Sequence, residues 1–443
     1  MKSFKIFICL IVAFNLTTLI NAQEKITLSK AITIALNQNT SIVKSTNNLE
    51  TSKASLKNAY GNLLPTLNVN SGWSWQRTSS AGTTVVNFFG EAQQTPPTQT
   101  DSRNYSLSAG GNVTLFDGLS NISTINIRKN DLKVAGYDLD KLRQDVVLQT
   151  VNLFITILNN EKVLKFQEED VKYNNDMLKK VKEMFDLNMK ANVDLYSQEY
   201  QTSNSQLSLL NAKSNYEKSK VTFLNYLAKD IFKEYVFEMD STYWPSAVKE
   251  MDNIESLYQI ALSNRKDYQS QLLKVESAGY QLTVARSGMF PGLSGNYNFS
   301  TSAVDPGELF NRKTYSFGLS LSFPIFSRWS TELSIQTAQA SIKNVNEDAK
   351  ALERTIKSDV KNAVLDLRTA KLQSDVTKNA LRSAKETWEI KRDSYTLGSA
   401  TFIDQQQSYR DYIQASNNAI ASESNYIYKK FGLLSALGLL KTE

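Results

Sequence analysis

Two aspartates, Asp194 and Asp404, are the charged residues whose positions in this chain indicate a shared chemical role. Each follows a short turn between helix-forming segments, and they lie 210 residues apart in similar surroundings. Carboxylates gathered at a constriction attract cations and disfavour anions. An aspartate after a turn is also well suited to cap the next helix. A capping aspartate can still face a pore, so both interpretations remain open.

The sequence carries no arrangement of residues that is typical of an enzyme. It has no histidine, which removes the usual neutral-pH general base and the commonest metal ligand. Its one cysteine, Cys9, lies near the N-terminus. No nucleophile elbow, phosphate loop or metal-ligand cluster is present. We therefore expect no catalytic residue, no cofactor and no bound metal.

The surroundings of the two aspartates match because most of the sequence occurs twice. With a shift of 226 residues, segment 34–73 aligns without a gap on 260–299 and places Pro65 on Pro291. Beyond residue 116 the shift becomes 210. A repeat of this length predicts two structurally equivalent halves. We assign them to residues 23–228 and 254–443, with an inter-repeat segment at 229–253.

Residues 1–22 are typical of a secretory signal peptide, with Lys2 and Lys5 before an apolar stretch and Ala22 at a plausible cleavage point. A membrane anchor is the alternative, but the apolar run is short and interrupted by polar residues. Cys9 comes too early to be a lipid-attachment site, so we expect export without a lipid anchor. No later run of 18 apolar residues exists, so any membrane-spanning part must consist of strands.

The net charge of +6 is spread along the chain, with acidic and basic residues mixed. Nucleic-acid binding would need a clustered basic face, so we expect none. The inter-repeat segment breaks the helical periodicity and is expected to form a small separate structure beside the helices. It contains an aromatic group, namely Phe232, Tyr235, Phe237, Tyr243 and Trp244, together with Pro245.

Each repeat is expected to contain a helix, a strand pair and two long helices. The first helix should cover 28–64, with Ser29 as N-cap, and its counterpart 254–290, each ending at a proline. A long helix over 120–185 and its counterpart in the second repeat are followed by returning helices over 193–228 and 403–440. The helix before the strands and the returning helix are each about half as long as the long helix. Stacked end to end, these two would match its length. A heptad spacing predicts antiparallel coiled-coil packing through Ile157, Leu164, Val171, Leu178 and Phe185, and through Leu367, Ser374, Leu381, Trp388 and Tyr395.

After each proline the apolar residues alternate with small polar ones, which indicates strands. Segments 77–104 and 301–313 connect the strands and are expected to be exposed loops. A soluble sheet with one wet face fits the alternation, but the predicted signal peptide and the aromatic content favour transmembrane barrel strands. The expected lipid-facing residues are Leu67, Val69, Trp73, Trp75, Tyr297, Phe299, Tyr315, Phe317, Leu319, Leu321 and Phe323.

Four strands cannot close a barrel, and open strand edges are costly in lipid because their backbone groups find no partner. The chain must therefore oligomerise if it spans a membrane. Two copies would make a narrow eight-stranded barrel, whereas three copies would make a 12-stranded one. The polar strand faces would then line water, and the whole would be a tube.

In this order of elements the sequence resembles the TolC family of outer-membrane efflux and secretion channels. The resemblance covers essentially all of the chain after the signal segment. It rests on Leu28-Ser29, on 35–39 (ALNQN), on Ala261-Leu262 with Arg265-Lys266-Asp267, on Pro65 and Pro291, and on the turn 395–404 (YTLGSATFID).

This resemblance implies a mainly α-helical homotrimer with a 12-stranded β-barrel in the outer membrane of a Gram-negative bacterium and an α-barrel in the periplasm. It also implies a passive exit duct for tripartite efflux or type I secretion. Such a duct docks a periplasmic adaptor (membrane fusion) protein that connects it to an RND, MFS or ABC pump. The alternative is an exported coiled-coil scaffold of the cell envelope.

The resemblance further implies roles for the residues at the helical turns. Asp404 and Asp194 are expected at the periplasmic gate, with Tyr395 as a further member unless it only packs in the helix seam. Gln407 and Ala400 depart from the family, which often has an acidic and a basic residue there, so Lys190 is expected to supply a different ion pair. The expected adaptor-contact residues, which are otherwise plain turns, are Leu187, Asn188, Met189, Leu397, Gly398 and Ser399. Glycine and asparagine both tolerate the positive φ of such a turn.

Overall fold

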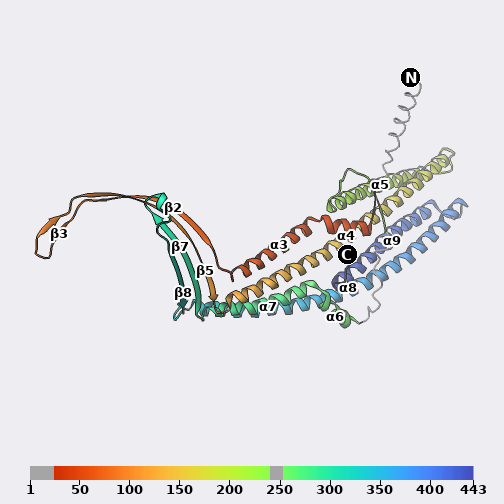
Figure 1. The fold of residues 1–443 in the computed structure, drawn as a ribbon. Helices are drawn as coiled ribbons and strands as arrows, with labels where there is room; N and C mark the ends of the chain where they lie inside the picture. Colours follow the sequence, from red (N-terminus) through yellow and green to blue (C-terminus); the bar gives the residue numbers. More distant parts are fainter. Residues whose placement is uncertain (1–23, 240–252, 443) are drawn as a thin grey trace, which may run out of the picture. The chain divides into compact units, whose positions relative to one another are not determined.

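The computed structural model describes residues 24–239 and 253–442 (Figure 1). The predicted signal peptide with Cys9 lies outside these residues, as do Tyr243, Trp244 and Pro245 of the inter-repeat segment. Within the described ranges, every helix is too short or too polar to cross a membrane.

Corresponding helices of the two sequence repeats have equal lengths. Both repeats contain helices of 11, 22, 67 and 35 residues in that order. In the first repeat they are α2 (Leu28–Gln38), α3 (Thr40–Gly61), α4 (Ser120–Asp186) and α5 (Asn192–Tyr226). In the second they are α6 (Ile254–Asn264), α7 (Lys266–Ser287), α8 (Ser330–Thr396) and α9 (Phe402–Ala436).

The first helix of each repeat, expected to be continuous, is broken after 11 residues. Asn39 adopts an extended conformation with ψ 123°, and its side-chain oxygen accepts a hydrogen bond of 2.9 Å from the Ser41 N–H at the start of α3. Arg265 is equally extended at the matching break, with ψ 120°. The expected cap at Ser29 is also wrong, because the Thr27 hydroxyl accepts from the Lys30 N–H instead. The helices α3 and α7 end at Gly61 and Ser287, a few residues before Pro65 and Pro291.

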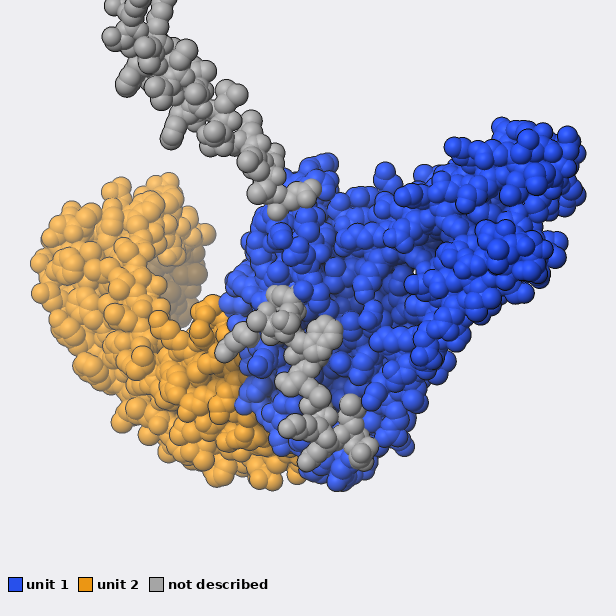
Figure 2. All heavy atoms as spheres, turned by 90° about the vertical axis from the view of Figure 1, so that its right-hand side faces the viewer, with its two compact units in different colours: residues 1–47, 137–269, 351–443 blue, residues 48–136, 270–350 orange. Residues whose placement is uncertain are grey.

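The chain forms two compact units (Figure 2). Unit 1 comprises residues 1–47, 137–269 and 351–443, and unit 2 comprises residues 48–136 and 270–350. Each unit takes segments from both sequence repeats. Unit 1 holds α5, α9 and the segments of α4 and α8 that pair with them, and unit 2 holds the main sheet.

The main sheet is antiparallel, with the strand order β2-β5-β7-β8. Its strands are β2 (Asn68–Ser80), β5 (Thr98–Phe116), β7 (Gly292–Ala303) and β8 (Thr314–Ser322). The expectation of a plain loop over 77–104 is wrong. β2 and β5 extend into it, where Arg77 and Asp101 pair across the strands at 2.6 Å, and β3 (Thr84–Val86) pairs with β4 (Ala92–Gln94) at its end.

A small core in unit 1 joins the inter-repeat segment to the first repeat. β6 (Tyr235–Glu238) pairs in parallel with β1 (Glu24–Thr27), and its Phe237 is buried. The Phe237 ring packs edge-on against Phe154 of α4 and Phe223 of α5, with centroids 6.3 and 5.8 Å apart. The described part of the predicted aromatic group thus lies partly in this core. Phe232 does not, because it is 92% exposed.

A second core in unit 1 joins three helices of the second repeat. Leu257 and Ala261 of α6 pack with apolar residues of α8 and with Leu433 and Leu437 near the end of α9. Gly438, which follows α9 at φ 71°, lies so close to the break before α7 that a Cβ there would be 3.0 Å from the Arg265 nitrogen. The end of α9 therefore meets the α6–α7 break beside α8, which agrees with the predicted end-to-end arrangement of short helices.

Candidate functional site

The two turns that join the long helices have the same backbone geometry. Asn188 has φ 56° and Gly398 has φ 75°. In each turn the next N–H reaches back five residues, from Met189 to the Met184 carbonyl and from Ser399 to the Ser394 carbonyl, both at 2.8 Å. This is the helix end that a left-handed residue makes. Asparagine tolerates that conformation, so the two turns close in the same way despite the different residue.

The residues predicted to contact a partner are all exposed at these turns. The side chains of Leu187, Met189 and Leu397 are 70%, 68% and 83% exposed. Asn188, Gly398 and Ser399 are exposed as well. Each turn thus presents apolar side chains to its surroundings.

Lys190 connects the two turns. Its ammonium lies 3.5 Å from the Asp194 carboxylate, 4.9 Å from the centroid of the Tyr395 ring and 5.5 Å from that of Phe402. Tyr395 and Phe402 also pack on Val181 and Met177 of α4. The structure therefore brings together Lys190, Asp194 and Tyr395, three of the residues predicted for the gate. The Tyr395 hydroxyl is buried and has no hydrogen-bond partner within the described chain.

Asp404 and Gln407 have separate surroundings. Thr401 is the N-cap of α9, its hydroxyl accepts from the Asp404 N–H at 3.1 Å, and an Asp404 carboxylate oxygen accepts from the Thr401 N–H at 3.4 Å. Hydrogen bonding to the carboxylate by the Thr401 side chain and backbone lowers the pKa of the exposed Asp404 carboxyl. Gln407 bonds with Asp411 and Arg410. Asp404 thus completes a capping box and keeps its charge exposed, so the two roles considered for it are compatible.

Sequence reasoning missed a buried polar seam where the two hairpins meet. The buried positions of α4 in this region are Gln167, Asp170, Asn174, Met177 and Val181, so the heptad spacing holds but its phase differs from the predicted one. Gln198 of α5 donates to the Asn174 backbone oxygen at 3.1 Å and accepts from Gln406 of α9 at 3.2 Å. Gln167, Asp170 and Asn174 are polar, so hydrophobic periodicity could not find these three positions.

The main sheet has one apolar and one polar face, as the register of its strands requires. One row joins Val69, Ala109, Phe299 and Tyr315 across all four strands. The neighbouring row joins Asn68, Gly110, Asn298 and Ser316. Most of the predicted lipid-facing side chains are at least half exposed, whereas Tyr297 and Phe299 are less exposed in the middle of the sheet. The outer strands β2 and β8 each pair on one side only among the described strands.

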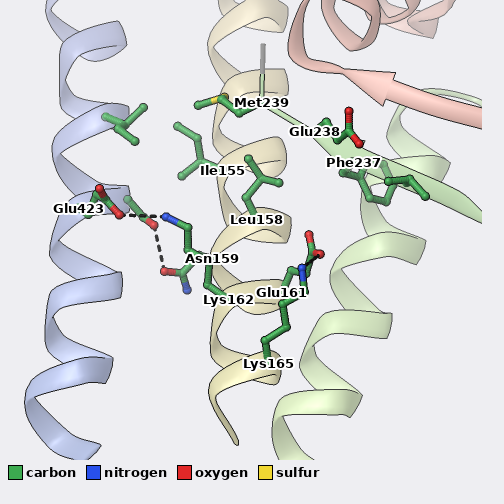
Figure 3. Close-up of a pocket in the computed structure, with 13 residues that line it drawn as sticks. Ile155, Leu158, Asn159, Glu161, Lys162, Lys165, Phe237, Glu238, Met239 and Glu423 are labelled. Carbon is green, nitrogen blue, oxygen red and sulfur yellow. Dashed lines mark hydrogen bonds and ion pairs between the residues drawn. The ribbon is translucent and has the colours of Figure 1, made fainter. Parts of the chain in front are cut away.

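A pocket of about 550 Å³ lies between α4, α9 and β6 (Figure 3). Its apolar lining includes Ile155, Leu158 and Phe237. An ion pair of 2.9 Å between Lys162 and Glu423 joins α4 to α9 across it. Glu161 and Lys165 of the lining pair with each other on α4. The charged groups of the pocket thus have partners, and no group of three metal-ligating side chains occurs in the described ranges.

The comparisons with known proteins concern both sequence and fold. A sequence model of the outer membrane efflux protein family matches residues 31–229 and 257–439. The pyoverdine export outer membrane protein OpmQ of Pseudomonas aeruginosa is 22% identical over 199 residues, which are 45% of this chain. The match spans 41% of that relative.

Solved structures resemble nearly the whole chain. The structure of CusC, described by its conformational changes on folding and transmembrane channel formation, has a TM-score of 0.81 at 15% identity, covering 94% of this chain and 93% of that one. The CmeC outer membrane channel of Campylobacter jejuni has a TM-score of 0.78 at 19% identity, covering 93% and 85%. At these identities the similarity establishes the fold.

Proposed function

The chain belongs to the outer membrane efflux protein family, and from this premise we propose that it is the outer-membrane exit channel of an efflux system. It conducts substrates passively from a periplasmic adaptor and an inner-membrane pump across the outer membrane. The assembly is a homotrimer, exported by a cleaved signal peptide. An RND, MFS or ABC pump, or a type I secretion exporter, supplies the substrate and the energy.

The observation that carries this proposal is the two-faced sheet, whose outer strands each pair on one side only among the strands that the structure describes. Val69, Phe299 and Tyr315 lie in one apolar row, and Asn68, Asn298 and Ser316 in the adjacent polar row. Lipid on one face and water on the other would suit both rows. The unpaired edges of β2 and β8 need a partner in lipid, and three copies supply it by closing a 12-stranded barrel.

The paired helices form the periplasmic tunnel in this proposal. Each repeat contributes a long helix of 67 residues and helices of 11, 22 and 35 residues beside it. Three chains then place six hairpins around one axis. The exposed Leu187, Met189 and Leu397 at the turns are the surface that an adaptor would cover.

The gate in this proposal has two parts. Asp404 carries a charge that its capping hydrogen bonds keep ionised, and three copies of it form an anionic ring. Lys190 joins the neighbouring turns within one chain through the Tyr395 ring, and Asp194 pairs with Lys190 inside its own turn. Gln407 makes its hydrogen bonds with Asp411 and Arg410 and so belongs to neither part.

Purification and electrical recording test the proposal. The protein should fractionate with outer membranes, migrate as a heat-sensitive trimer and form conducting pores in planar lipid bilayers. An exported scaffold would be extracted without membrane lipid and would not conduct. Absence of conductance from correctly assembled trimers would contradict the channel assignment.

Asp404→Asn tests the charge of the proposed ring separately from helix capping, because the amide can still accept at the cap. We expect weaker block by polyvalent cations in Asp404→Asn and in Asp404→Ala. Exposed Asp393, in the last turn of α8, provides a control: Asp393→Asn should leave the block unchanged. Wild-type block in both Asp404 variants would remove this residue from the gate.

A further inference from the structure

Asp170 is a carboxylate buried between the two helical hairpins. Its side chain on α4 is 6% exposed. One carboxylate oxygen accepts from the hydroxyl of Tyr409 on α9 at 2.6 Å and from the Asn174 amide at 2.8 Å. Across the described ranges Asp170 makes no ion pair with lysine or arginine. A buried carboxylate without a cation is costly to keep ionised.

Aromatic rings surround this hydrogen bond and exclude water from it. The ring centroid of Tyr173 on α4 lies 4.2 Å from that of Tyr409, and the ring centroid of Trp388 on α8 lies 5.4 Å from it. Tyr412 stacks on Trp388 at 5.0 Å with an interplanar angle of 6°. Three helices from both hairpins therefore meet at the Asp170–Tyr409 pair.

The groups facing the pair do not offset the charge of Asp170. The Asp170 carboxylate meets the hydroxyl of Tyr409 on α9. The Tyr409 ring has Tyr412 of α9 and Tyr173 of α4 beside it. Arg392 of α8 is a cation beside Trp388, with its guanidinium 5.3 Å from the centroid of that ring, and it pairs with Asp393. From α5 the network receives the uncharged Gln198 and Thr202.

Protonation of Asp170 therefore depends on whether the hairpins are packed. Burial raises the pKa of the Asp170 carboxyl, and the hydrogen bonds from Tyr409 and Asn174 offset this only in part. If the hairpins separated, water would restore a pKa near the ordinary value of 3.8. Between these two pKa values the packed form binds a proton that the separated form does not. Acidification through this window stabilises the packed form, and the stabilisation is lost as the pH rises through the raised pKa.

We propose that Asp170 and Tyr409 form a proton-dependent clamp between the α4–α5 and α8–α9 hairpins, packed in acid and released as the pH rises. On the proposed function, the clamp couples opening of the channel to the pH of the periplasm. The hydrogen bond between the side-chain amides of Gln198 and Gln406 has no titratable group, so Asp170 sets the pH response. This device is distinct from the exposed charge of Asp404, whose lowered pKa places its titration at more acidic pH.

Distance measurement between spin labels tests the clamp without relying on conduction. Labels on cysteines at the exposed positions Lys172 of α4 and Gln414 of α9 report the separation of the hairpins, in assemblies diluted with unlabelled chain. The chain's one other cysteine, Cys9, lies in the predicted signal peptide and is removed on export. The wild-type distance should increase from acid to mildly alkaline pH. A constant distance would overturn the proposal.

Three variants assign the response to this site. Asp170→Asn should lose the pH dependence, whereas Asp176→Asn, at an exposed aspartate on the same helix, should keep it. A wild-type response in Asp170→Asn would overturn the proposal. Tyr409→Phe removes a bond that favours the charged carboxylate, so the midpoint should move to higher pH by about one unit or more. A midpoint moved to lower pH, or left in place, would equally overturn it.

Bilayer recordings on the same variants separate this inference from the proposed function. Open probability should follow the distance in wild type and become independent of pH in Asp170→Asn. If the distance responds to pH but no variant conducts, the channel assignment fails and the clamp stands. If the channel conducts and the distance does not respond, the clamp fails alone.

Discussion

Replacing Lys190 by methionine should loosen the contact between the two helical turns. Methionine keeps the length and apolar stem of the side chain but removes its charge. The ammonium lies 4.9 Å from the Tyr395 ring and 5.5 Å from the Phe402 ring, and its side chain is only 20% exposed. We therefore expect the loss to act on the proposed gate, where Lys190, Tyr395 and Phe402 join the α4–α5 turn to α8 and α9.

The magnitude follows from the contacts that are lost. A cation over an aromatic ring contributes about 0.5–1 kcal/mol at exposed sites and more when desolvated. The pair with Asp194, at 3.5 Å, lies four residues along the chain within the α4–α5 turn, so it does not join the two turns. The two ring contacts together stabilise the packed turns by about 1–2 kcal/mol, so their loss should raise the open-to-closed ratio roughly 5- to 30-fold.

Single-channel recording in planar bilayers measures that ratio directly. Lys190→Arg is the matched control, because a guanidinium can lie over the same rings and pair with Asp194. Lys179, exposed on α4, provides a second control as Lys179→Met. The reasoning is refuted if Lys190→Met has the open probability of wild type, or if Lys179→Met changes it as much.

Two further predictions concern stability. Phe154→Ala should lower the free energy of unfolding by about 3–5 kcal/mol, because Phe154 packs on both Phe223 and Phe237. Phe232→Ala, at an exposed position, should change it by less than about 0.5 kcal/mol. Similar thermal transitions in the two variants would contradict the assigned core. Gly438→Ala should destabilise more than Gly398→Ala: both residues have positive φ and share a cost of about 1–2 kcal/mol, but only at Gly438 does an added Cβ meet backbone, that of Arg265 and Asn264. Heat stability of the assembled protein gives the order, and the reverse order would argue against the junction of α9 with α6.

The repeat predicted much of the helical structure from sequence alone. A constant shift from Phe116/Phe326 onward requires helices of equal length, and α4 and α8 each have 67 residues. The same alignment places Asn188 on Gly398, and both residues adopt positive φ. The breaks at Asn39 and Arg265 were not predictable from periodicity. They rest on one ψ angle each and on the bonds their side chains make with Ser41, Asp267 and Asp359.

The candidate site was harder to predict, because hydrophobic periodicity gives the phase of a helix only when its buried residues are apolar. Leu164, Val171 and Leu178 carry the heptad spacing on α4, yet they are only half-buried, and Asp170 and Asn174 lie deeper. The contacts of Lys190 with Tyr395 and Phe402 join residues about 200 positions apart, so only the folded chain reveals them.

The polar seam between the hairpins has a consequence for hairpins that separate and pack again. When helices joined by leucine and valine separate, they expose surface that adheres to any other apolar surface nearby. Gln198, Gln406 and Asn174 can instead exchange their mutual hydrogen bonds for bonds to water at little net free energy. Separated hairpins with a polar seam stay hydrated, so they can pack together again rather than aggregate. The apolar core around Phe154 lacks this property, which suits a part of the molecule that stays assembled.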